Sequence, residues 1–349
     1  MTSRAFRVGL TRGMRSPEGG SALGDIGLEL LDSDPDVNWE FLDADPLELT
    51  AELIRDYDAL LVGDSNTQVT RRTLASVERL AVIARLGVGY DQIDEGACTE
   101  KDILLTITPD GVRRPMAVAL LTLVLALAHK VLIKDRLTRA GRWGEKDHYR
   151  GMGVTGRTVG LIGFGNIARE FVHVSRALDL RYLAYDPFVR PTDEERATVE
   201  FVDLTALLST SDFVCVTCPL TKETYHLLDA DRLALLRSDA YLVNIARGPI
   251  VDLVALTRLL AERGIAGAAI DVFESEPVDP MDPLLQLENI IVTPHAIGHT
   301  DAIFLGNGRS ACRSILEVAA GRIPKYVVNR SVVERAGLQA KLEGYGRGV

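Results

Sequence analysis

Short apolar runs alternate with helix-like segments along most of the chain. In the first third of the sequence the runs lie at residues 6–10, 59–63, 81–87 and 103–109. Further runs follow at residues 158–165, 181–187, 213–219, 240–248, 267–273 and 289–295. Runs of this length that end in Gly, Pro or a polar residue are typical of parallel strands buried on both faces. The alternation therefore predicts an α/β protein whose parallel sheets are covered by helices.

Amphipathic patterns between these runs predict the helices. They cover residues 167–178, 229–237, 253–263 and 301–320. Thr300 is the expected N-cap of the last of them. The most apolar stretch, 116–128, predicts a buried helix over 116–133 that begins at Pro115. It is shorter than the about 18 residues of a membrane span and apolar on all sides. We therefore expect its own domain and a second subunit to cover it.

Length and charge narrow the class of protein. A chain of 349 residues is too long for one typical core and predicts two domains. Hydrophobic residues make up 47% and charged residues 25%, as in ordinary globular proteins. The net charge of −10 argues against a nucleic-acid-binding or anionic-membrane surface. The N-terminal segment has no long apolar run, so we expect no signal peptide.

The cysteines favour a structural role. Cys215 and Cys218 form a C-x-x-C, but a zinc site would need a second pair. A redox motif should lie at a helix N-terminus, whereas this pair lies in a strand-like run. We therefore expect packing rather than redox or metal chemistry, in a reduced, cytoplasmic protein.

A glycine-rich turn predicts a dinucleotide site. The segment GFGNIA follows a strand-like run and opens a helix, in the pattern G-x-G-x-x-A. Gly163 allows the tight turn, Gly165 allows close approach of a pyrophosphate, and Asn166 and Ile167 present amide groups at the helix N-terminus. Asp186 ends the next strand, 186 − 165 = 21 residues on, where an acid binds ribose hydroxyls. A carboxylate there disfavours a 2′-phosphate, so we expect NAD rather than NADP; the alternative is that Asp186 only caps its strand.

Three later strand ends carry polar residues that a fold does not need. Arg247, Glu276 and His295 each follow an apolar run. Ligands of open α/β sheets bind at the carboxyl ends of strands, so all three are expected to converge on the nicotinamide. His299 lies four residues after His295, but Pro294 and Gly298 prevent one helix from carrying both. We therefore do not expect a metal pair.

Taken together, these motifs resemble the NAD-dependent D-isomer-specific 2-hydroxyacid dehydrogenases. The likeness is carried by GVGYDQID (87–94), GLIGFGNIA (160–168), YDPF (185–188), CPLTKETYHLL (218–228), NIARGPIVD (244–252), DVFESEP (271–277) and TPHAIGHT (293–300). The resemblance implies a Rossmann NAD domain, 112–301, inserted into a flavodoxin-like substrate domain, 1–111 and 302–335, with a tail at 336–349. It also implies a homodimer through the NAD domain.

The resemblance assigns roles to the polar strand ends. Arg247 should bind the substrate carboxylate and the developing carbonyl oxygen, for which its planar fork of donors is suited. His295 should be the acid and base, because an imidazole exchanges protons near neutral pH. Glu276 should orient that imidazole, whereas Glu274 does not match the family position.

The family pattern also implies contacts with cofactor and substrate. Asp271 and the backbone near Ala246 should hold the nicotinamide carboxamide, and Cys218, Pro219 and Thr224 should lie beside the cofactor. In the substrate domain, the amides of Val88 and Gly89 should bind the substrate carboxylate.

The substrate is expected to be an unphosphorylated 2-oxo or 2-hydroxy acid such as glyoxylate or hydroxypyruvate. Asp64 stands where relatives acting on phosphorylated substrates often have an arginine, and an aspartate would repel a phosphate. The alternatives are a 3-phosphoglycerate dehydrogenase, an NAD-sensing co-repressor-like protein, and a phosphite or amino-acid dehydrogenase on the same fold.

Overall fold

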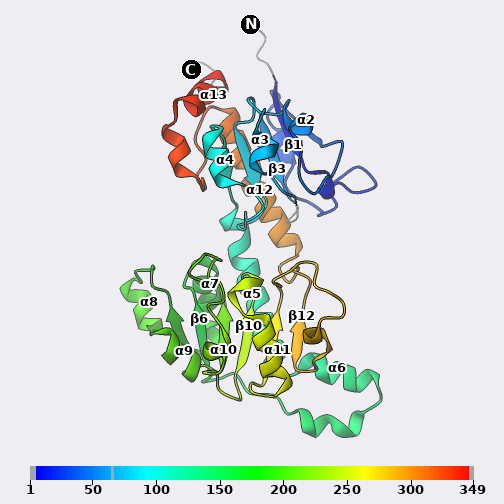
Figure 1. Cartoon of the computed structure of the whole chain (residues 1–349), viewed down its shortest axis with the longest axis vertical. Coiled ribbons are helices and arrows are strands. Elements are labelled where there is room, and N and C mark those ends of the chain that lie inside the picture. Colours follow the sequence, from blue (N-terminus) through cyan, green and yellow to red (C-terminus); the bar gives the residue numbers. More distant parts are fainter. Residues whose placement is uncertain (1–4, 64–66, 346–349) are drawn as a thin grey trace. The chain divides into compact units, whose positions relative to one another are not determined.

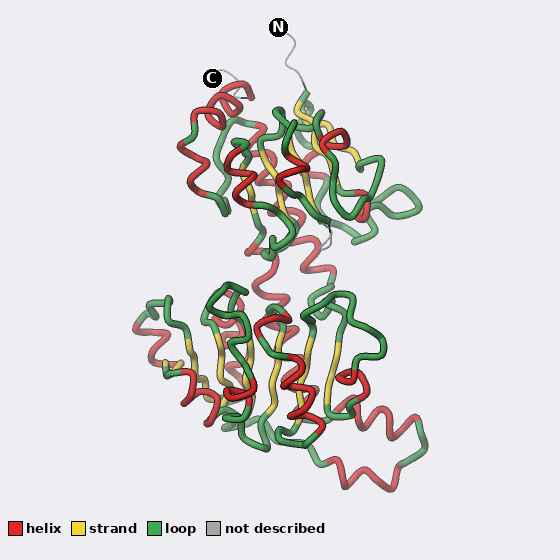
Figure 2. Tube along the Cα trace, viewed as in Figure 1, coloured by secondary structure: helices red, strands yellow, loops and turns green. Residues whose placement is uncertain are grey.

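The computed structural model describes residues 5–63 and 67–345, so Asp64 lies outside the described residues. The chain divides into two compact units. Unit 1 comprises residues 1–112 and 299–349, and unit 2 comprises residues 113–298. Unit 2 is therefore an insertion in the chain of unit 1, as the fold class predicts. Figure 1 labels elements of both units where there is room, and Figure 2 separates helices from strands by colour.

Unit 1 is built on a parallel sheet in the order β2-β1-β3-β4-β5, which is the flavodoxin-like order. Its strands are β1 (Phe6–Leu10), β2 (Val37–Phe41), β3 (Ala59–Val62), β4 (Val82–Arg85) and β5 (Leu104–Thr106). Its helices are α1 (Glu29–Asp32), α2 (Ala51–Ile54), α3 (Arg71–Leu74), α4 (Glu95–Glu100), α12 (Asp301–Ala319) and α13 (Ala336–Tyr345), with 3-10 turns η1 (Arg12–Met14) and η6 (Arg330–Glu334). One core cluster joins the sheet to α1, α12 and α13, and another joins it to α2, α3 and α4. Thr300 caps α12 as expected, because its side chain accepts from the amide of Ile303.

Unit 2 is a Rossmann-type sheet in the order β12-β11-β10-β9-β6-β7-β8. Its strands are β6 (Thr158–Ile162), β7 (Arg181–Tyr185), β8 (Val199–Phe201), β9 (Phe213–Val216), β10 (Tyr241–Asn244), β11 (Gly267–Ile270) and β12 (Ile290–Val292). Its helices are α5 (Pro109–Ala128), α6 (Val131–Arg139), α7 (Asn166–Ser175), α8 (Asp193–Thr198), α9 (Leu204–Thr210), α10 (Ala230–Leu233) and α11 (Leu253–Ala261), with 3-10 turns η2 (Trp143–Tyr149), η3 (Arg176–Leu178), η4 (Gly248–Ile250) and η5 (Pro283–Gln286). The cores place α5 and α7 on one face of the sheet and α9, α10 and α11 on the other.

The long apolar helix differs from its prediction. Helix α5 begins at Pro109, six residues before Pro115, and the boundary between the units falls inside it. It ends at Ala128 because Lys130 takes a left-handed backbone, with φ of 51°, and α6 then begins separately. Among the described helices, α5 is the one long and apolar enough to cross a membrane by length and composition. Half of its most apolar window is buried, and these side chains fill the core of unit 2.

The C-terminal segment is ordered rather than a loose tail. Helix α13 docks on unit 1 with Leu338 and Leu342 buried, and the hydroxyl of Tyr345 donates to Asp58 Oδ1 at 2.9 Å. The ammonium group of Lys341 donates to the carbonyls of Leu80, Lys101 and Asp102, at 2.8, 2.9 and 3.1 Å. Residues 336–345, predicted only as a tail, therefore form a helix packed on unit 1.

Two strands were missed. β2 and β8 lie at the edges of their sheets and are only partly buried. An edge strand with one solvated face lacks the continuous apolar run by which the others were recognised. Both pair in parallel with their neighbours, so the omission does not change the fold class.

Candidate active site

His295 and Glu276 form a hydrogen-bonded pair in unit 2. His295 follows β12, and its Nδ1 lies 2.8 Å from Oε2 of Glu276. The other oxygen of Glu276 accepts from the amide of Phe273 at 2.9 Å, which fixes the carboxylate. Since Nδ1 is occupied by Glu276, Nε2 is the ring nitrogen left to exchange a proton with a ligand.

The turn that carries His295 is strained and firmly held. The backbone of His295 has φ of 53°, a left-handed conformation uncommon for residues other than glycine. Its amide donates to the carbonyl of Asp271 at 2.7 Å. The Oδ1 atom of Asp271 accepts from Thr293 Oγ1, Ala296 N and Ile297 N at 2.6, 2.9 and 3.0 Å. Asp271 is 2% exposed, so a buried carboxylate at the end of β11 sets the orientation of the imidazole.

Arg247 is positioned by the turn after β10. The buried side chain of Asn244 donates to the carbonyl of Arg247 at 2.9 Å and accepts from the amide of Ala246 at 3.0 Å. A Cβ on Gly248 would lie 1.9 Å from the carbonyl carbon of Phe273. The absence of a side chain at Gly248 therefore lets the Arg247 turn pack directly on the loop that carries Glu276.

The three side chains also interact electrostatically. Burial favours the neutral form of the Glu276 carboxyl, but the hydrogen bonds from His295 and the Phe273 amide favour the ionised form. The charges of His295 and Arg247 act in the same direction. The net result is that the pKa of Glu276 is held below its ordinary value, so it is a carboxylate at neutral pH. That carboxylate is the hydrogen-bond partner of Nδ1 and so holds the imidazole of His295 in one orientation.

The glycine turn after β6 has the features that a dinucleotide needs. Gly163 has φ of 91°, and a Cβ there would lie 2.7 Å from the backbone of Cys218. Gly165 is the N-cap of α7, and a Cβ there would meet no atom within 4 Å. The backbone at Gly165 therefore faces open space at the positive end of a helix, beside the amides of Asn166 and Ile167, which fits an incoming pyrophosphate.

Asp186 has local partners of its own. Its Oδ2 accepts from the amide of Phe164 at 2.8 Å, and its Oδ1 accepts from Phe188 and Val189 at 3.0 and 3.1 Å. The carboxylate thus ties the end of β7 to the glycine turn, as the capping alternative predicts. It is half-buried and retains lone pairs for a ribose, so the two roles are compatible.

The 218–224 loop closes on itself. Thr224 Oγ1 donates to the carbonyl of Pro219 at 2.8 Å and accepts from the amide of Thr221 at 2.7 Å. Its hydroxyl therefore shapes the loop from within. Cys218 is buried, and burial raises the pKa of its thiol to about 11, so the thiol is neutral at physiological pH.

Val88 and Gly89 lie in unit 1, at the carboxyl end of β4. Both are half-buried. Within the described ranges, no group accepts a hydrogen bond from either amide. Two adjacent amides without protein acceptors are suited to bind an anion.

The other candidates fall outside this set. His299 belongs to unit 1, and its ring lies 5.1 Å from that of Phe304. His226 Nε2 lies 3.3 Å from Glu274 Oε2, so Glu274 pairs with His226 rather than with His295. All four cysteines are free and buried. Among residues 5–63 and 67–345, no group of three or more His, Cys, Asp or Glu side chains is arranged to hold a metal.

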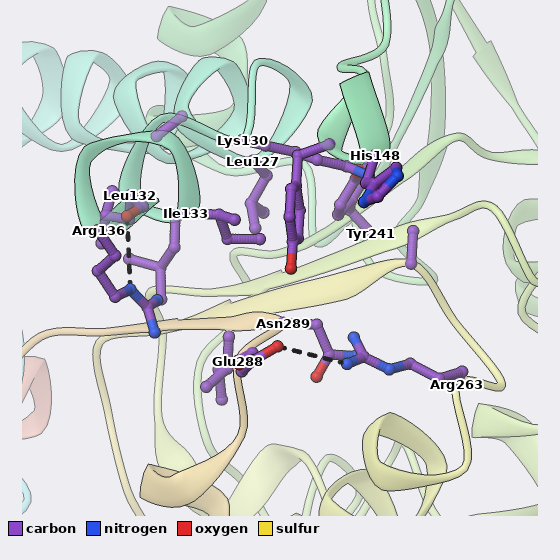
Figure 3. Close-up of a pocket in the computed structure, with 15 residues that line it drawn as sticks. Leu127, Lys130, Leu132, Ile133, Arg136, His148, Tyr241, Arg263, Glu288 and Asn289 are labelled. Carbon is purple, nitrogen blue, oxygen red and sulfur yellow. Dashed lines mark hydrogen bonds and ion pairs between the residues drawn. The ribbon is translucent and has the colours of Figure 1, made fainter. Parts of the chain in front are cut away.

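A pocket of about 320 Å³ lies elsewhere in unit 2 (Figure 3). It is at the amino ends of β10, β11 and β12, with Tyr241 and Ile290 among its lining residues, whereas His295 and Arg247 follow the carboxyl ends. In Figure 3 Arg263 pairs with Glu288 across from Lys130. This pocket is therefore separate from the candidate active site.

Fold and site together define a class: a dinucleotide-binding oxidoreductase with a His–Glu pair and an arginine at the strand ends of its Rossmann sheet. The sequence profile described as "D-isomer specific 2-hydroxyacid dehydrogenase, NAD binding domain" matches residues 121–296. The chain belongs to the D-isomer specific 2-hydroxyacid dehydrogenase family, and it is an NAD-dependent enzyme of that family.

Individual relatives cover most of the chain. It is 37% identical over 295 residues to the glyoxylate reductase of Thermococcus gammatolerans, covering 83% of this chain and 88% of the relative. It is 36% identical over 286 residues to the D-3-phosphoglycerate dehydrogenase of Archaeoglobus fulgidus, covering 81% of this chain but 54% of the relative. The solved 2-hydroxyacid dehydrogenase of Ketogulonicigenium vulgare Y25 superimposes with a TM-score of 0.76 at 26% identity, covering 94% and 99% of the two chains.

The sequence analysis missed Asn244 and one role of Asp271 in this site. Asn244 is fully buried at the end of β10, where an apolar side chain would be the ordinary choice. Asp271 was expected only at the nicotinamide, whereas its Oδ1 organises the His295 turn. In both cases a polar residue at the end of an apolar run was the feature of the sequence that could have indicated this role.

Proposed function

We propose that this enzyme reduces a small unphosphorylated 2-oxo acid of the glyoxylate or hydroxypyruvate type with NADH, and catalyses the reverse oxidation of the D-2-hydroxy acid. The observation that carries the proposal is the 2.8 Å pairing of His295 with Glu276, on a strand end close to that of Arg247. A charged arginine and an acid–base histidine are the two groups that a 2-oxo acid requires.

In the proposed mechanism, the amides of Val88 and Gly89 and the guanidinium of Arg247 bind the substrate carboxylate. Arg247 also polarises the carbonyl oxygen. His295 donates the proton on Nε2 to that oxygen in reduction and accepts it in oxidation. Glu276 stabilises the imidazolium before transfer. The dinucleotide, when bound, supplies or accepts the hydride.

We assign the cofactor to the glycine turn of unit 2. Gly163, Gly165, Asn166 and Ile167 would hold the pyrophosphate, and Asp186 would accept hydrogen bonds from the ribose hydroxyls. A carboxylate repels a 2′-phosphate, which favours NAD over NADP.

Residues around the nicotinamide complete the proposed cofactor site. The backbone near Ala246 and the side chain of Asp271 would hold the carboxamide. Cys218, Pro219 and Thr224 would line the adjacent loop, and His295 would contact the ring.

We also propose that the protein is a cytoplasmic homodimer associating through α5 and the segment after it. Val118 on α5 is 46% exposed, and Val131 and Trp143 are 50% and 67% exposed. Large apolar side chains at this density favour a protein partner. Four free cysteines favour a reducing compartment. Size-exclusion chromatography with light scattering tests the dimer, and a monomer at micromolar concentration would contradict it.

The experiment for the main proposal is a panel of initial rates. Purified protein is assayed with NADH and with NADPH against glyoxylate, hydroxypyruvate, pyruvate, 2-oxoisocaproate, phenylpyruvate and 3-phosphohydroxypyruvate. We expect NADH-dependent turnover of an unphosphorylated acid. A preference for 3-phosphohydroxypyruvate would instead support the second candidate, which the 36% identity to a D-3-phosphoglycerate dehydrogenase favours. NADH binding without turnover of any acid would support a sensing role.

A further inference from the structure

Three carbonyl oxygens of the 86–89 loop of unit 1 accept hydrogen bonds from within that unit. The carbonyls of Leu86 and Gly89 accept from the side chain of Arg85, at 2.5 and 3.0 Å. The carbonyl of Gly87 accepts from the amide of Thr108 at 2.9 Å. Among the described residues, no group accepts a hydrogen bond from the amides of Val88 and Gly89, so these two amides remain available to an external anion.

Arg85 occupies the last position of β4 and is 9% exposed. Besides the two loop carbonyls, its Nη1 donates to the carbonyls of Val62 and Gly63 at 3.3 and 3.4 Å. The guanidinium thus ties the 86–89 loop to the end of β3. A Cβ added at Gly87 would lie at ordinary contact distance, 3.7 Å, from the Arg85 Cζ atom, so the guanidinium lies beside the turn.

Gly87 has φ of 138°, which gives the loop its unusual peptide orientation. Its amide donates to Thr108 Oγ1 at 2.7 Å, and that hydroxyl lies 3.0 Å from Asn307 Oδ1. Thr108 therefore fixes the middle of the loop and Arg85 fixes both ends. Of these two side chains, Arg85 alone adds a positive charge behind the outward amides.

We propose that Arg85 is a positioning residue for substrate binding: its buried guanidinium fixes the 86–89 loop so that the Val88 and Gly89 amides face the substrate carboxylate, and its charge strengthens their attraction for that anion. This inference rests on the proposed function, in which those amides bind a 2-oxo acid. Arg85 itself acts through the loop and is given no direct role in hydride or proton transfer.

A structural role alone would give a different pattern of defects. An arginine that only stabilised unit 1 would, when replaced, lower the melting temperature without a specific effect on the substrate. A positioning role predicts weaker substrate binding with a preserved chemical step, because Arg247, Glu276 and His295 belong to unit 2. NADH binding should also be preserved.

Lys341 provides a matched control. Like Arg85, it is a cation of unit 1 that donates to several backbone carbonyls. Its partners Leu80 and Asp102 precede β4 and β5, so it lies at the amino ends of the strands. Lys341→Met should lower the melting temperature and leave the KM for the 2-oxo acid within twofold of wild type.

The test compares wild type, Arg85→Met, Arg85→Lys and Lys341→Met. For each protein the melting temperature, the Kd for NADH, the kcat and KM for the best 2-oxo acid, and inhibition by oxamate are measured. Oxamate is a planar carboxylate that is not reduced. For Arg85→Met we expect the KM and the oxamate inhibition constant to rise about tenfold or more, the loss typical of one charge-assisted hydrogen bond. The kcat should stay within threefold and the NADH Kd within twofold. Arg85→Lys keeps the positive charge but loses the several donors of the guanidinium, so its KM should lie between those of wild type and Arg85→Met.

An Arg85→Met enzyme with wild-type KM and oxamate inhibition would overturn the proposal, as would a Lys341→Met enzyme with an equally raised KM. If Arg85→Met does not fold, the lysine variant decides: a wild-type KM there refutes positioning by the fork. A wild-type enzyme that reduces no 2-oxo acid and is not bound by oxamate indicates failure of the proposed function instead.

Discussion

Replacing Glu276 by Gln changes one hydrogen bond at the imidazole while keeping the shape of the side chain. In the wild-type protein one oxygen of Glu276 accepts from the Phe273 amide at 2.9 Å and the other lies 2.8 Å from His295 Nδ1. In Glu276→Gln the amide oxygen can keep the Phe273 contact. The amide NH₂ then faces Nδ1 and disfavours a proton on it. The protonated imidazole needed for reduction is therefore destabilised.

The size of the effect follows from exposure. Hydrogen bonds to charged groups contribute about 1.5–3 kcal/mol. The side chains of His295 and Glu276 are 36% and 33% exposed, so solvent screening places this pair near the lower end of that range. A loss of about 1.5–2 kcal/mol corresponds to a decrease in kcat of roughly 10- to 30-fold.

The assay is stopped-flow reduction of the best 2-oxo acid at one pH, with NADH affinity measured separately. Glu274→Gln is the matched control, because Glu274 pairs with His226 and not with His295. It should retain kcat within threefold. A Glu276→Gln enzyme with wild-type kcat, or equal impairment of the two variants, would show that Glu276 does not act on His295.

Three further results are expected. His295→Ala should bind NADH normally and lose most turnover, and His299→Ala should cost far less; retained activity in the former would remove His295 from the mechanism. Gly248→Ala should impair folding or kcat strongly, because its Cβ would lie 1.9 Å from the Phe273 backbone. Circular dichroism and kinetics measure the two effects. A Gly248→Ala protein with wild-type folding and kcat would contradict the close packing of this turn on the Phe273 backbone. Burial lowers the pKa of Lys341 to about 8 from an unfolded value of 10.5, so the unfolded chain binds more protons between these values. The free energy of unfolding of wild type relative to Lys341→Met should therefore rise from pH 8 to pH 10, and parallel pH profiles would be inconsistent with it.

The central strands and the glycine turn were accessible from sequence because burial on both faces leaves a continuous apolar run. β2 and β8 were not, since edge strands keep polar positions. The start of α5 was misplaced because Pro115 was interpreted as a helix start, whereas Pro109 opens the helix after the buried Thr108. Proline is tolerated in the first turn of a helix, but tertiary contacts decide at which of two prolines the helix begins.

The sequence predicted the side chains of the candidate site, but not the hydrogen bonds that position them. The pairing of His295 with Glu276 follows from family position, and the structure brings the two together. Arg85 donates to backbone carbonyls and Asp271 accepts from backbone amides, and both sets of hydrogen bonds depend on the direction of the backbone after each strand. Local sequence does not encode that direction, because it results from how neighbouring loops pack.

The configuration of the product tests the proposed reaction most directly. Wild-type enzyme is incubated with NADH and each 2-oxo acid whose reduction creates a stereocentre, and the hydroxy acid formed is resolved by chiral chromatography. We expect formation of the D-2-hydroxy acid, dependent on His295. Formation of the L-isomer, or undiminished product from His295→Ala, would contradict it.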